Sequence, residues 1–552
     1  MTINDPSLAP PSPLSVPQTA VRSSEWSFAA LVIALVLVIT ALPPLFAYLT
    51  APSDRVFTGV IFNIPDHNQY FAWMRDLSSA NLAPNRLTAE PNEPALFHLL
   101  WWTAGRVGAW FGLSVGAIFG ILRVLGAAVL LVTAYAFLRV TVADLAQRRL
   151  AFVIFAFGGG LGIVWVVVKY LLGLPDAPFP FDIYTSEPNS FFLALAFPHF
   201  AIALALVIAM IGLTFVAHQR QQLRYAVAAG LIGTLIGLQH AYDLLTVATI
   251  LSGFTLLIWW RDRRFPVFLL KAGMLIAIFT IPPGAYLSYL VLTDATWGGK
   301  LAQFDNAGAW TPGPLHLPIL LGVPFLLAIL AFRPRMLQSR SDAEILIAVW
   351  FLSHFGLVYL PLKFQIHLLL GWQVPIAILA AAALLKLVGP WTRTRWGRRS
   401  EQFVLAGLLG LAIITNGYLV AWRIIDLGRY AAPYYLSKNE AAALTWLEQH
   451  TTRADVVLGE LEINQHVPAW TDARAFLAHW AGTLDYFAKL DAVQLVLDPA
   501  IPEAERQAVL DQFGVTYLIV REQDVALDAL AVAAPSLRPV FSQGEVTIFR
   551  YR

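Results

Sequence analysis

Long apolar runs constrain this chain more than any other feature of its sequence. Most of them reach the roughly 20 residues that a helix needs to cross the hydrocarbon core of a bilayer. Hydrophobic residues make up 58% and charged residues 13% of the 552 residues, whereas about a quarter of the residues of a soluble domain are charged. We therefore predict a polytopic α-helical membrane protein with about 11 transmembrane helices. The runs lie at residues 26–49, 114–138, 149–173, 190–217, 225–241, 244–260, 266–292, 315–332, 343–360, 368–388 and 401–423.

The loops between these runs alternate in charge. One set is poor in Lys and Arg, and the other is basic. The positive-inside rule places the basic set in the cytoplasm. The N-terminus is then expected to be cytoplasmic and the C-terminal part extracytoplasmic. The basic clusters lie at residues 139–149, 220–224, 261–264, 333–340 and 386–399.

Three segments complete the predicted domain organisation. Residues 1–25 are rich in Pro and Ser and predict a disordered cytoplasmic tail, ahead of a transmembrane domain at residues 26–423. Residues 50–113 form one large external loop. Its last part, at residues 95–113, is short for a transmembrane helix and is interrupted by Arg106, and its tryptophans favour a helix at the membrane interface.

The character of the chain changes in its last part, at residues 437–552. Ser437 and Glu440 form an S-x-x-E capping box, which predicts the start of an amphipathic helix. The segments DVVLGE and GVTYLIV are typical of buried strands, a helix is expected near residues 502–513, and Gly544 lies in the turn of a terminal hairpin. This pattern predicts a small extracytoplasmic α/β domain with a core of its own.

The charge distribution and the absence of cysteine exclude several classes. The net charge of +2 is spread along the chain, which argues against a nucleic-acid partner, because such a partner needs a concentrated basic face. Without cysteine there is no disulfide framework and no thiolate nucleophile. Any metal ion would need His and carboxylate ligands.

The external loop reads FNIPDHNQYF soon after the first apolar run, which places Asp66 and His67 near the outer face of the membrane. A carboxylate at this place could act as a general base on a substrate hydroxyl, or it could help to hold a divalent cation. It could also be the N-cap of a helix that starts at Asn68, since Asp is a common N-cap residue. The spacing alone favours the capping role.

Ionisable residues in or beside the apolar runs are a second group of candidates, because such groups are costly in lipid and usually functional. Taken singly, each is better explained as a snorkelling lysine or a hydrogen-bonded core residue. As a set, they predict an outward-facing polar cavity that suits a phosphate on a lipid anchor. The substrate-binding candidates are His67, Arg123, Lys169, Glu187, His199, His240, Asp243, Lys363 and His367.

The C-terminal domain carries one more group of candidates, within residues 469–490. Tryptophan, acidic residues and histidine can line a carbohydrate site, and the domain would then hold an acceptor over the mouth of the cavity. Packing or loop closure explains the same residues without a ligand and is favoured. The group consists of Asp472, Arg474, His479, Trp480 and Asp485.

Several short motifs follow one another along the chain. An acidic residue comes soon after the first helix, the interfacial helix ends in G-L-S at residues 112–114, the next helix has an Arg near its start, and RRLAF follows at residues 148–152. This layout resembles the GT-C superfamily of integral membrane glycosyltransferases, which includes protein mannosyltransferases and bacterial aminoarabinose transferases. The PHF element at residues 198–200 and the final α/β domain also resemble large glycosyltransferase-like proteins of the bacterial envelope.

The resemblance implies inverting transfer of a hexosyl or pentosyl sugar from a polyprenyl-phosphate donor at the outer face of the plasma (inner) membrane. The envelope acceptor would be a glycan, a lipid or a protein. By motif position, Asp66 would be the catalytic base or a metal-holding acid. The chain has no D-x-D pair here, so a reaction without metal and one with Mg²⁺ or Mn²⁺ held by Asp66 and Glu187 both stay open.

Two rival functions fit the same composition. A membrane transporter also has many helices with buried charges, but it usually contains internal repeats, and none is evident in this sequence. A non-catalytic envelope scaffold is compatible too, because a fold does not establish a function. Convergence of Asp66, Glu187, His199 and His240 on one cavity beside a lipid-sized groove would favour the transferase, and scattering of the four would favour the scaffold.

Overall fold

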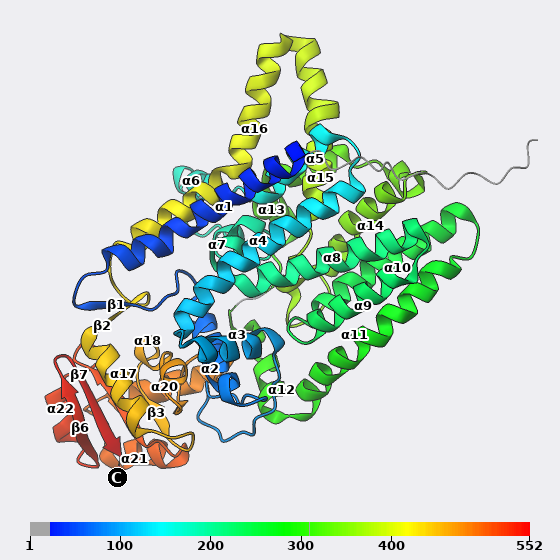
Figure 1. Ribbon diagram of the computed structural model, residues 1–552. Coiled ribbons are helices and arrows are strands. Elements are labelled where there is room, and N and C mark those ends of the chain that lie inside the picture. Colours follow the sequence, from blue (N-terminus) through cyan, green and yellow to red (C-terminus); the bar gives the residue numbers. More distant parts are fainter. Residues whose placement is uncertain (1–22, 308–309, 552) are drawn as a thin grey trace, which may run out of the picture.

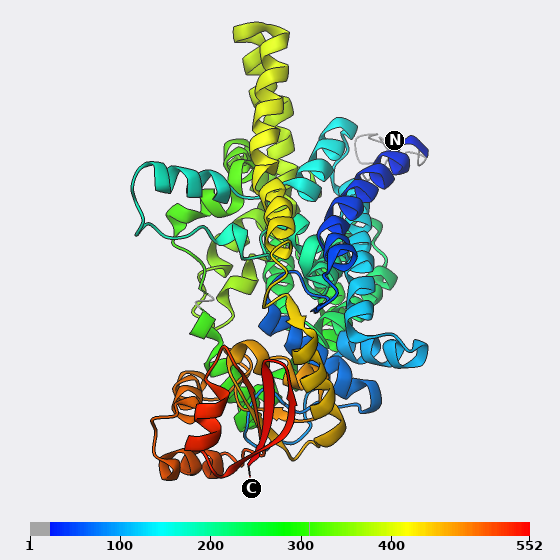
Figure 2. The same cartoon turned by 90° about the vertical axis from the view of Figure 1, so that its left-hand side faces the viewer.

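The computed structural model describes residues 23–307 and 310–551. It consists of a helical body and a C-terminal α/β domain at one end of that body (Figure 1). Residues 1–22 of the predicted tail lie outside the described residues, and Ser23 already begins α1 (Ser23–Thr50). Near the start of α1, Glu25 forms an ion pair of 3.0 Å with Arg148. This end of the body lies far from the C-terminal domain (Figure 2).

All of the predicted apolar runs lie on helices. Besides α1, the body contains α4 (Val115–Thr141), α5 (Leu145–Phe157), α6 (Gly162–Leu171), α7 (Ser190–Ala196), α8 (Pro198–Arg220), α9 (Leu223–Gly237), α10 (Asp243–Asp262), α11 (Val267–Thr293), α13 (Leu317–Ala331), α14 (Asp342–Leu357), α15 (Gln373–Ala383) and α16 (Gly389–Leu427). Within the described residues, seven helices are long and apolar enough to cross a membrane, or up to eight if the bent pair α5–α6 is one span. The polytopic membrane class is confirmed, whereas the count of about 11 crossings stays a prediction.

Local breaks explain why several runs are not single long helices. α5 and α6 are bent by 57° at the glycines of residues 158–160. α7 ends just before Pro198, which has no N–H with which to continue the hydrogen-bond ladder. α16 reverses at Gly397, where φ is 85°, so that its two halves form a hairpin that projects from the body (Figure 1).

Shorter helices lie at the end of the body next to the C-terminal domain: α2 (Ile64–Ser79), α3 (Leu99–Phe111) and α12 (Ala295–Ala302). Asn63 is the N-cap of α2, and Asp66 lies in its first turn. The expectation that Asp66 caps a helix starting at Asn68 is therefore wrong, because the helix starts four residues earlier. α3 agrees with the helix expected at residues 95–113 and ends at Gly112. Its position at the membrane interface stays a prediction.

The C-terminal domain contains a sheet of five described strands in the order β4-β3-β5-β7-β6. β3 runs parallel to β4 and β5, and β7 runs antiparallel to β5 and β6. The capping box of Ser437 and Glu440, the strands and the terminal hairpin are as predicted, whereas α20 and β4 are not foreseen. The elements are β2 (Tyr435–Ser437), α17 (Lys438–His450), β3 (Val456–Leu458), α18 (Leu461–Asn464), α19 (Val467–Trp470), β4 (Arg474–Ala475), α20 (Tyr486–Leu497), α21 (Glu503–Gln512), β5 (Tyr517–Arg521), α22 (Leu527–Ala533), β6 (Leu537–Gln543) and β7 (Val546–Tyr551).

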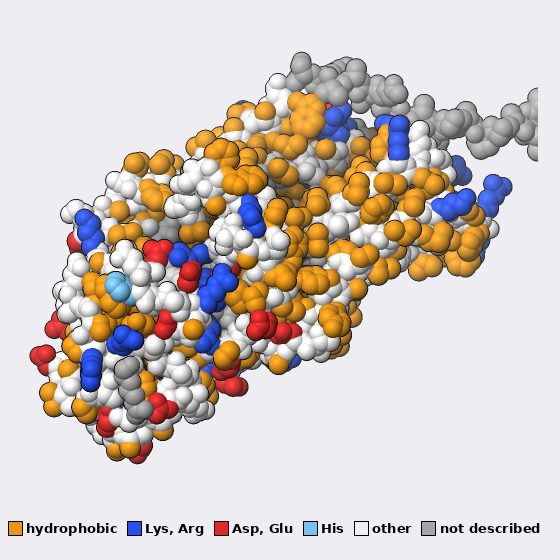
Figure 3. Space-filling model, turned by 60° about the horizontal axis from the view of Figure 1, so that its bottom comes forward, with side chains coloured by type: hydrophobic (Ala, Val, Ile, Leu, Met, Phe, Trp, Pro, Cys, Tyr) orange, Lys and Arg blue, Asp and Glu red, His pale blue; other side chains and the backbone are white. Residues whose placement is uncertain are grey.

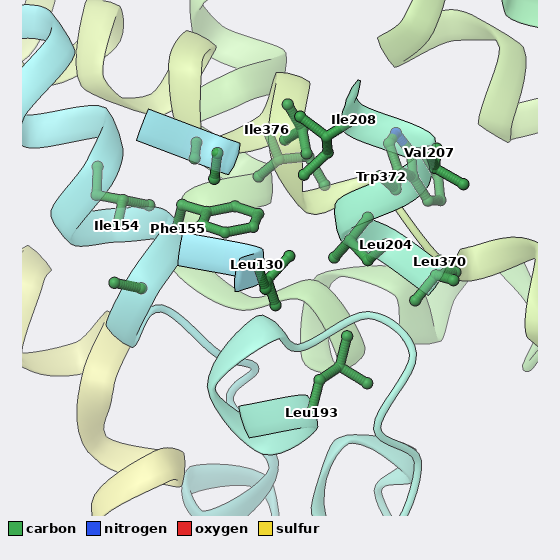
Figure 4. Close-up of a cluster of buried hydrophobic side chains, with 14 of the residues drawn as sticks. Leu130, Ile154, Phe155, Leu193, Leu204, Val207, Ile208, Leu370, Trp372 and Ile376 are labelled. Carbon is green, nitrogen blue, oxygen red and sulfur yellow. The ribbon is translucent and has the colours of Figure 1, made fainter. Parts of the chain in front are cut away.

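The body and the C-terminal domain have separate cores. In the body, side chains such as Leu130, Phe155, Leu204 and Trp372 come from different helices and pack into one buried cluster (Figure 4). The C-terminal domain has apolar clusters on both faces of its sheet. Its surface carries charges of both signs, whereas the flank of the body is mainly hydrophobic (Figure 3). This is the distribution expected for helices that face lipid and a domain that faces water.

The loop at residues 50–113 and the C-terminal domain are tied together. β1 (Arg55–Phe57), directly after α1, pairs antiparallel with β2, directly after α16. Arg86 forms a buried ion pair with Asp76, with Nε 3.0 Å from Oδ2. The same guanidinium donates to the carbonyls of Thr471 and Ala473 in the C-terminal domain. The loop and the domain, predicted as separate segments, therefore form one unit.

Candidate active site

The candidate site is built around the first turn of α2. Asn63 has a left-handed backbone with φ 46°, and a proline follows in the first turn, where its missing N–H is not needed. Asp66 therefore lies at the N-terminus of the helix, where the helix dipole favours a negative charge. It faces the C-terminal domain, through His479, and not the lipid.

Both carboxylate oxygens of Asp66 accept hydrogen bonds. Oδ2 accepts from the side-chain amide of Asn63, and Oδ1 lies 2.7 Å from Nε2 of His479. Burial raises the pKa of Asp66, but the hydrogen bond with His479 and the charges of the neighbouring histidines together outweigh this effect, so the pKa lies below the ordinary 3.8. The carboxylate is therefore ionised at neutral pH, and its side chain is 20% exposed, so a substrate can reach it.

Two carboxylate–imidazole pairs lie on the adjoining wall of the body. His240 places Nδ1 3.2 Å from Oδ2 of Asp243 at the start of α10, which is the contact expected from their spacing. In the short helix η6 (Gln365–Leu369), His367 places Nδ1 2.6 Å from Oε1 of Glu187. The ring of His199, near the start of α8, lies 5.6 Å from the ring of His240.

Aromatic side chains connect these pairs to α2. Tyr70, one turn after Asp66, places its hydroxyl 3.2 Å from Nε2 of His199. Tyr242 stacks on His367 with ring centroids 5.0 Å apart. The structure thus brings together, from segments far apart in the sequence, Asp66, Glu187, His199, His240, Asp243 and His367.

His67 and Lys169 have other surroundings. The ring nitrogens of His67 lie 2.7 Å from the carbonyl of Asn63 and 3.2 Å from that of Ala196, so this buried ring holds α2 against α7. Lys169, at the end of α6, donates to the carbonyl of Ala177. Both contacts are within the protein, and the substrate-binding roles of the two residues stay predictions.

Arg123 and Lys363 also have partners away from Asp66. Arg123 donates from Nη1 to the carbonyl of Thr40 at 2.9 Å. In a helix this carbonyl would accept from the residue four positions later, but that residue is Pro44, which has no N–H. Lys363 is exposed, and its Nζ forms an ion pair of 2.6 Å with Oδ2 of Asp305. Their expected roles as phosphate ligands therefore stay untested.

Lys300 of α12 is a buried cation near Asp66 and is not among the candidates predicted from the sequence. Its Nζ donates to the side chain of Gln69 and lies 4.6 Å from the ring centroid of Trp73. Burial lowers the pKa of Lys300 to about 7, while the charge of Asp66 raises it. The available signal was a single lysine in an external loop that is otherwise acidic.

An apolar groove of about 1400 Å³ opens beside the polar wall. Gln239 and Tyr242 line its polar end, and Tyr242 also contacts His367. The rest of the groove is lined mainly by aliphatic side chains of α10 and α11, such as Leu251 and Ile276. A groove of this kind suits a flexible hydrocarbon chain whose polar head lies at the histidine pairs.

The five candidates of the C-terminal domain differ in their surroundings. His479 contacts Asp66, and Trp480 packs against Phe304 of η3 (Phe304–Ala307) with ring centroids 5.5 Å apart. These two residues therefore belong to the border of the site. Two others are tied into the protein, Asp472 by an ion pair with Arg75 and Arg474 by a hydrogen bond to the carbonyl of Ala454. Asp485 is exposed and precedes α20 without a capping hydrogen bond from its side chain.

A metal site is not formed by the side chains of residues 23–307 and 310–551, since no three or more of their His, Asp and Glu groups are placed to hold an ion. At Asp66, both oxygens already face N–H donors. Glu187 is engaged by His367. Each oxygen of Asp66 keeps a free lone pair beside its hydrogen bond, and metal use stays a prediction.

No protein-family model and no curated protein matches this sequence. Solved structures do resemble it. ArnT from Cupriavidus metallidurans bound to undecaprenyl phosphate gives a TM-score of 0.53 at 14% identity and covers 96% of this chain and 98% of that chain. The Archaeoglobus fulgidus oligosaccharyltransferase tethered with an acceptor peptide gives a TM-score of 0.54 at 14% identity, over 91% of this chain and 71% of that chain. The chain has the GT-C fold.

The GT-C fold was the resemblance expected from the order of the short motifs, and it is confirmed. AglB from A. fulgidus, in complex with an inhibitory peptide and a dolichol-phosphate, has the same fold, with a TM-score of 0.50 at 14% identity over 91% of this chain and 71% of that chain. At these identities the likeness concerns the fold, so the chemistry has to be argued from the site of this GT-C chain itself.

Proposed function

We propose that this protein transfers a sugar from a polyprenyl-phosphate donor to an acceptor of the cell envelope, with inversion at the anomeric carbon. The position of Asp66 carries the proposal, because its carboxylate is ionised, partly exposed and near enough to affect Tyr242, which lines the polar end of the apolar groove. Its convergence with Glu187, His199 and His240 is the arrangement expected of a transferase and not of a scaffold.

The apolar groove accounts for the lipid chain of the donor. ArnT was solved with undecaprenyl phosphate and AglB with a dolichol-phosphate, which supports a lipid-linked donor in this fold. The phosphate lies at the polar end, between the histidine pairs and Lys300. An ammonium group and imidazole N–H groups are suitable donors to its oxygens.

The reaction is an in-line displacement. Asp66 removes the proton of the acceptor hydroxyl, and the acceptor oxygen bonds to the anomeric carbon from the face opposite the phosphate. The bond between that carbon and the phosphate oxygen breaks, which leaves polyprenyl phosphate and a glycoside of inverted configuration. Lys300 and the imidazoles stabilise the charge that develops on the phosphate.

The sidedness of the chain belongs to the same proposal. The C-terminal domain and the first external loop lie outside the cytoplasm at the plasma (inner) membrane, and the arginine clusters lie inside. The chain has no cysteine, so single cysteines at Asn81, Ser542 and Arg264 can be labelled cleanly. An impermeant reagent added to intact cells should modify the first two and spare the third. Labelling of only one of the first two would contradict the proposal.

An assay of purified protein with labelled polyprenyl-phosphate sugars tests the function. Wild type is compared with Asp66→Asn, and the matched control is Asp54→Asn in the same loop, whose side chain is 73% exposed. We expect turnover by wild type and by the control, and loss of turnover in Asp66→Asn. Equal turnover by all three would remove Asp66 from the mechanism.

A further inference from the structure

The C-terminal domain contributes one side chain to the candidate site. His479 lies in the loop at residues 478–485, between β4 and α20, and its side chain is 2% exposed. Its Nε2 lies 2.7 Å from Oδ1 of Asp66, although 413 positions separate the two residues. The helical body alone therefore leaves the surroundings of Asp66 incomplete.

The hydrogen bonds of His479 define its protonation state. Its Nδ1 accepts from the backbone N–H of Ala481 at 3.0 Å and from that of Gly482 at 2.9 Å. A ring nitrogen that accepts carries no hydrogen, so in the neutral ring the hydrogen is on Nε2 and is donated to Asp66. A second proton on Nδ1 would face two N–H donors and is disfavoured, in line with the burial that lowers the pKa of His479.

The loop is itself held from two sides. Asn85 of the first external loop donates to the carbonyl of Gly482 at 2.8 Å, and Thr483 donates to the carbonyl of Leu87 at 2.6 Å. At the end of α12, Gln303 donates to the carbonyl of Thr483 at 3.0 Å. A Cβ atom on Gly482 would lie only 2.6 Å from the side chain of Leu87, so the loop packs closely. The imidazole is therefore fixed in orientation as well as in tautomer.

We propose that His479 is a positioning residue for the reaction: it donates from Nε2 to Asp66, keeps the carboxylate ionised and directs its free lone pairs to the acceptor. The C-terminal domain is thereby an essential part of the active centre. The catalytic consequence rests on the proposed function, whereas the contact and the tautomer do not. His479 cannot relay the proton that Asp66 takes up, because its other nitrogen is occupied as an acceptor.

Other groups face this pair from the neighbouring elements, and they decide the choice of experiment. They are His67 and Tyr70 from α2, His367 from η6 and Lys300 from α12. A pH profile of activity would mix their titrations with that of Asp66. The tautomer of His479 is therefore measured directly, and turnover is measured at one pH.

The first test is nitrogen NMR on ¹⁵N-histidine-labelled full-length protein in lipid nanodiscs. The signals of His479 are assigned as those that are absent from the spectrum of His479→Gln but present in the spectrum of His450→Gln. His450 is an exposed histidine of the same domain. We expect a protonated Nε2 and an unprotonated Nδ1 at about pH 7. A proton on Nδ1 at this pH, with or without one on Nε2, would overturn the proposal.

The second test compares turnover numbers. We expect His479→Ala to lower kcat by about 10- to 100-fold, as part of the contribution of a general base, without raising KM for the donor. His479→Gln keeps an N–H that can donate to Asp66 and should recover part of this loss. Wild-type kcat in His479→Ala, or equal losses in the two variants together with a raised KM, would show a merely structural role.

The two tests separate the inference from the function on which it rests. If the wild type turns over no polyprenyl-phosphate sugar but shows the expected tautomer, the proposed function fails and the contact stands. If the wild type is active and the tautomer is wrong, the function stands and His479 is not the positioning residue.

Discussion

Two buried cations of the helical body and the charged groups at its junction with the C-terminal domain are satisfied in different ways. In the body, Arg123 and Lys169 each donate to a single backbone carbonyl. At the junction, ionised groups pair with one another, as Arg86 does with Asp76, ten residues earlier, and Lys489 with the distant Glu90. The difference teaches that the junction is a specific polar interface. Asp66 belongs to this interface and not to the lipid-facing part of the molecule.

The largest effect should distinguish two carboxylates of α2 that lie ten residues apart. Asp66→Asn keeps the shape of the side chain and its hydrogen-bond acceptor but cannot take a proton, so turnover should fall by about 10²- to 10⁴-fold. Asp76→Asn should mainly lower the melting temperature, because it leaves Arg86 buried without a carboxylate. Calorimetry and the transferase assay on both variants measure these two effects. A large loss of turnover in Asp76→Asn together with a lower melting temperature in Asp66→Asn would reverse the roles of the two residues.

The second prediction compares the arginines of the two regions. Arg86→Met leaves Asp76 with only the half-exposed Arg453, 3.4 Å away, as a charged partner and should cost about 3 kcal/mol of unfolding free energy. Arg123→Met leaves only the neutral carbonyl of Thr40 without a donor and should cost about 1–3 kcal/mol. Chemical denaturation in a mild detergent measures both. Equal losses would show that the junction is no more dependent on its ion pairs than the body is on its single hydrogen bonds.

A smaller effect is expected from the pH dependence of Lys300, which lies at the junction. Its pKa is lowered to about 7, so the side chain is charged below this pH and neutral above it. If only the charged form binds the donor phosphate, KM for the donor should rise about fivefold between pH 7 and pH 8. Lys300→Arg stays charged and should remove this rise. A pH-independent KM in the wild type would exclude Lys300 as a phosphate ligand.

The smallest effect should come from the lipid side of the site. Gly273 lines the groove and has open space beside it, so Gly273→Phe fills part of the groove without a clash. KM for a long-chain donor should rise about threefold and kcat should stay the same, because only binding of the chain is lost. Gly407→Phe, also in open space but on α16, is the control. An unchanged KM in Gly273→Phe would place the lipid chain elsewhere.

Much of the fold could be predicted from the sequence, because apolar length and loop charge are local signals. The predicted runs all lie on helices, and the S-x-x-E box starts α17 as expected. Breaks were less predictable. The bend after α5 depends on packing that periodicity does not record, whereas the reversal at Gly397 lies in the basic segment predicted between the runs at residues 368–388 and 401–423.

The candidate site divides in the same way. The contact between His240 and Asp243 follows from a spacing of three residues, and the acidic residue after the first helix could be selected from its position. The sequence suggests His479 only as part of a carbohydrate site, because no local pattern predicts its contact with a carboxylate 413 positions away. The sequence shows Lys300 only as one charge of a loop, because its burial results from the packing of α12 against α2.

The pairing of β1 with β2 has a consequence for the order in which the protein matures. One strand follows α1, and its partner follows α16, the last helix of the body, so the other helices of the body are synthesised between them. β1 therefore has no strand to pair with until the helices up to α16 have been synthesised. The hydrogen bond between Asp66 and His479 forms later still, because His479 is translated after β2. A nascent or prematurely terminated chain would occupy the membrane without a finished catalytic centre.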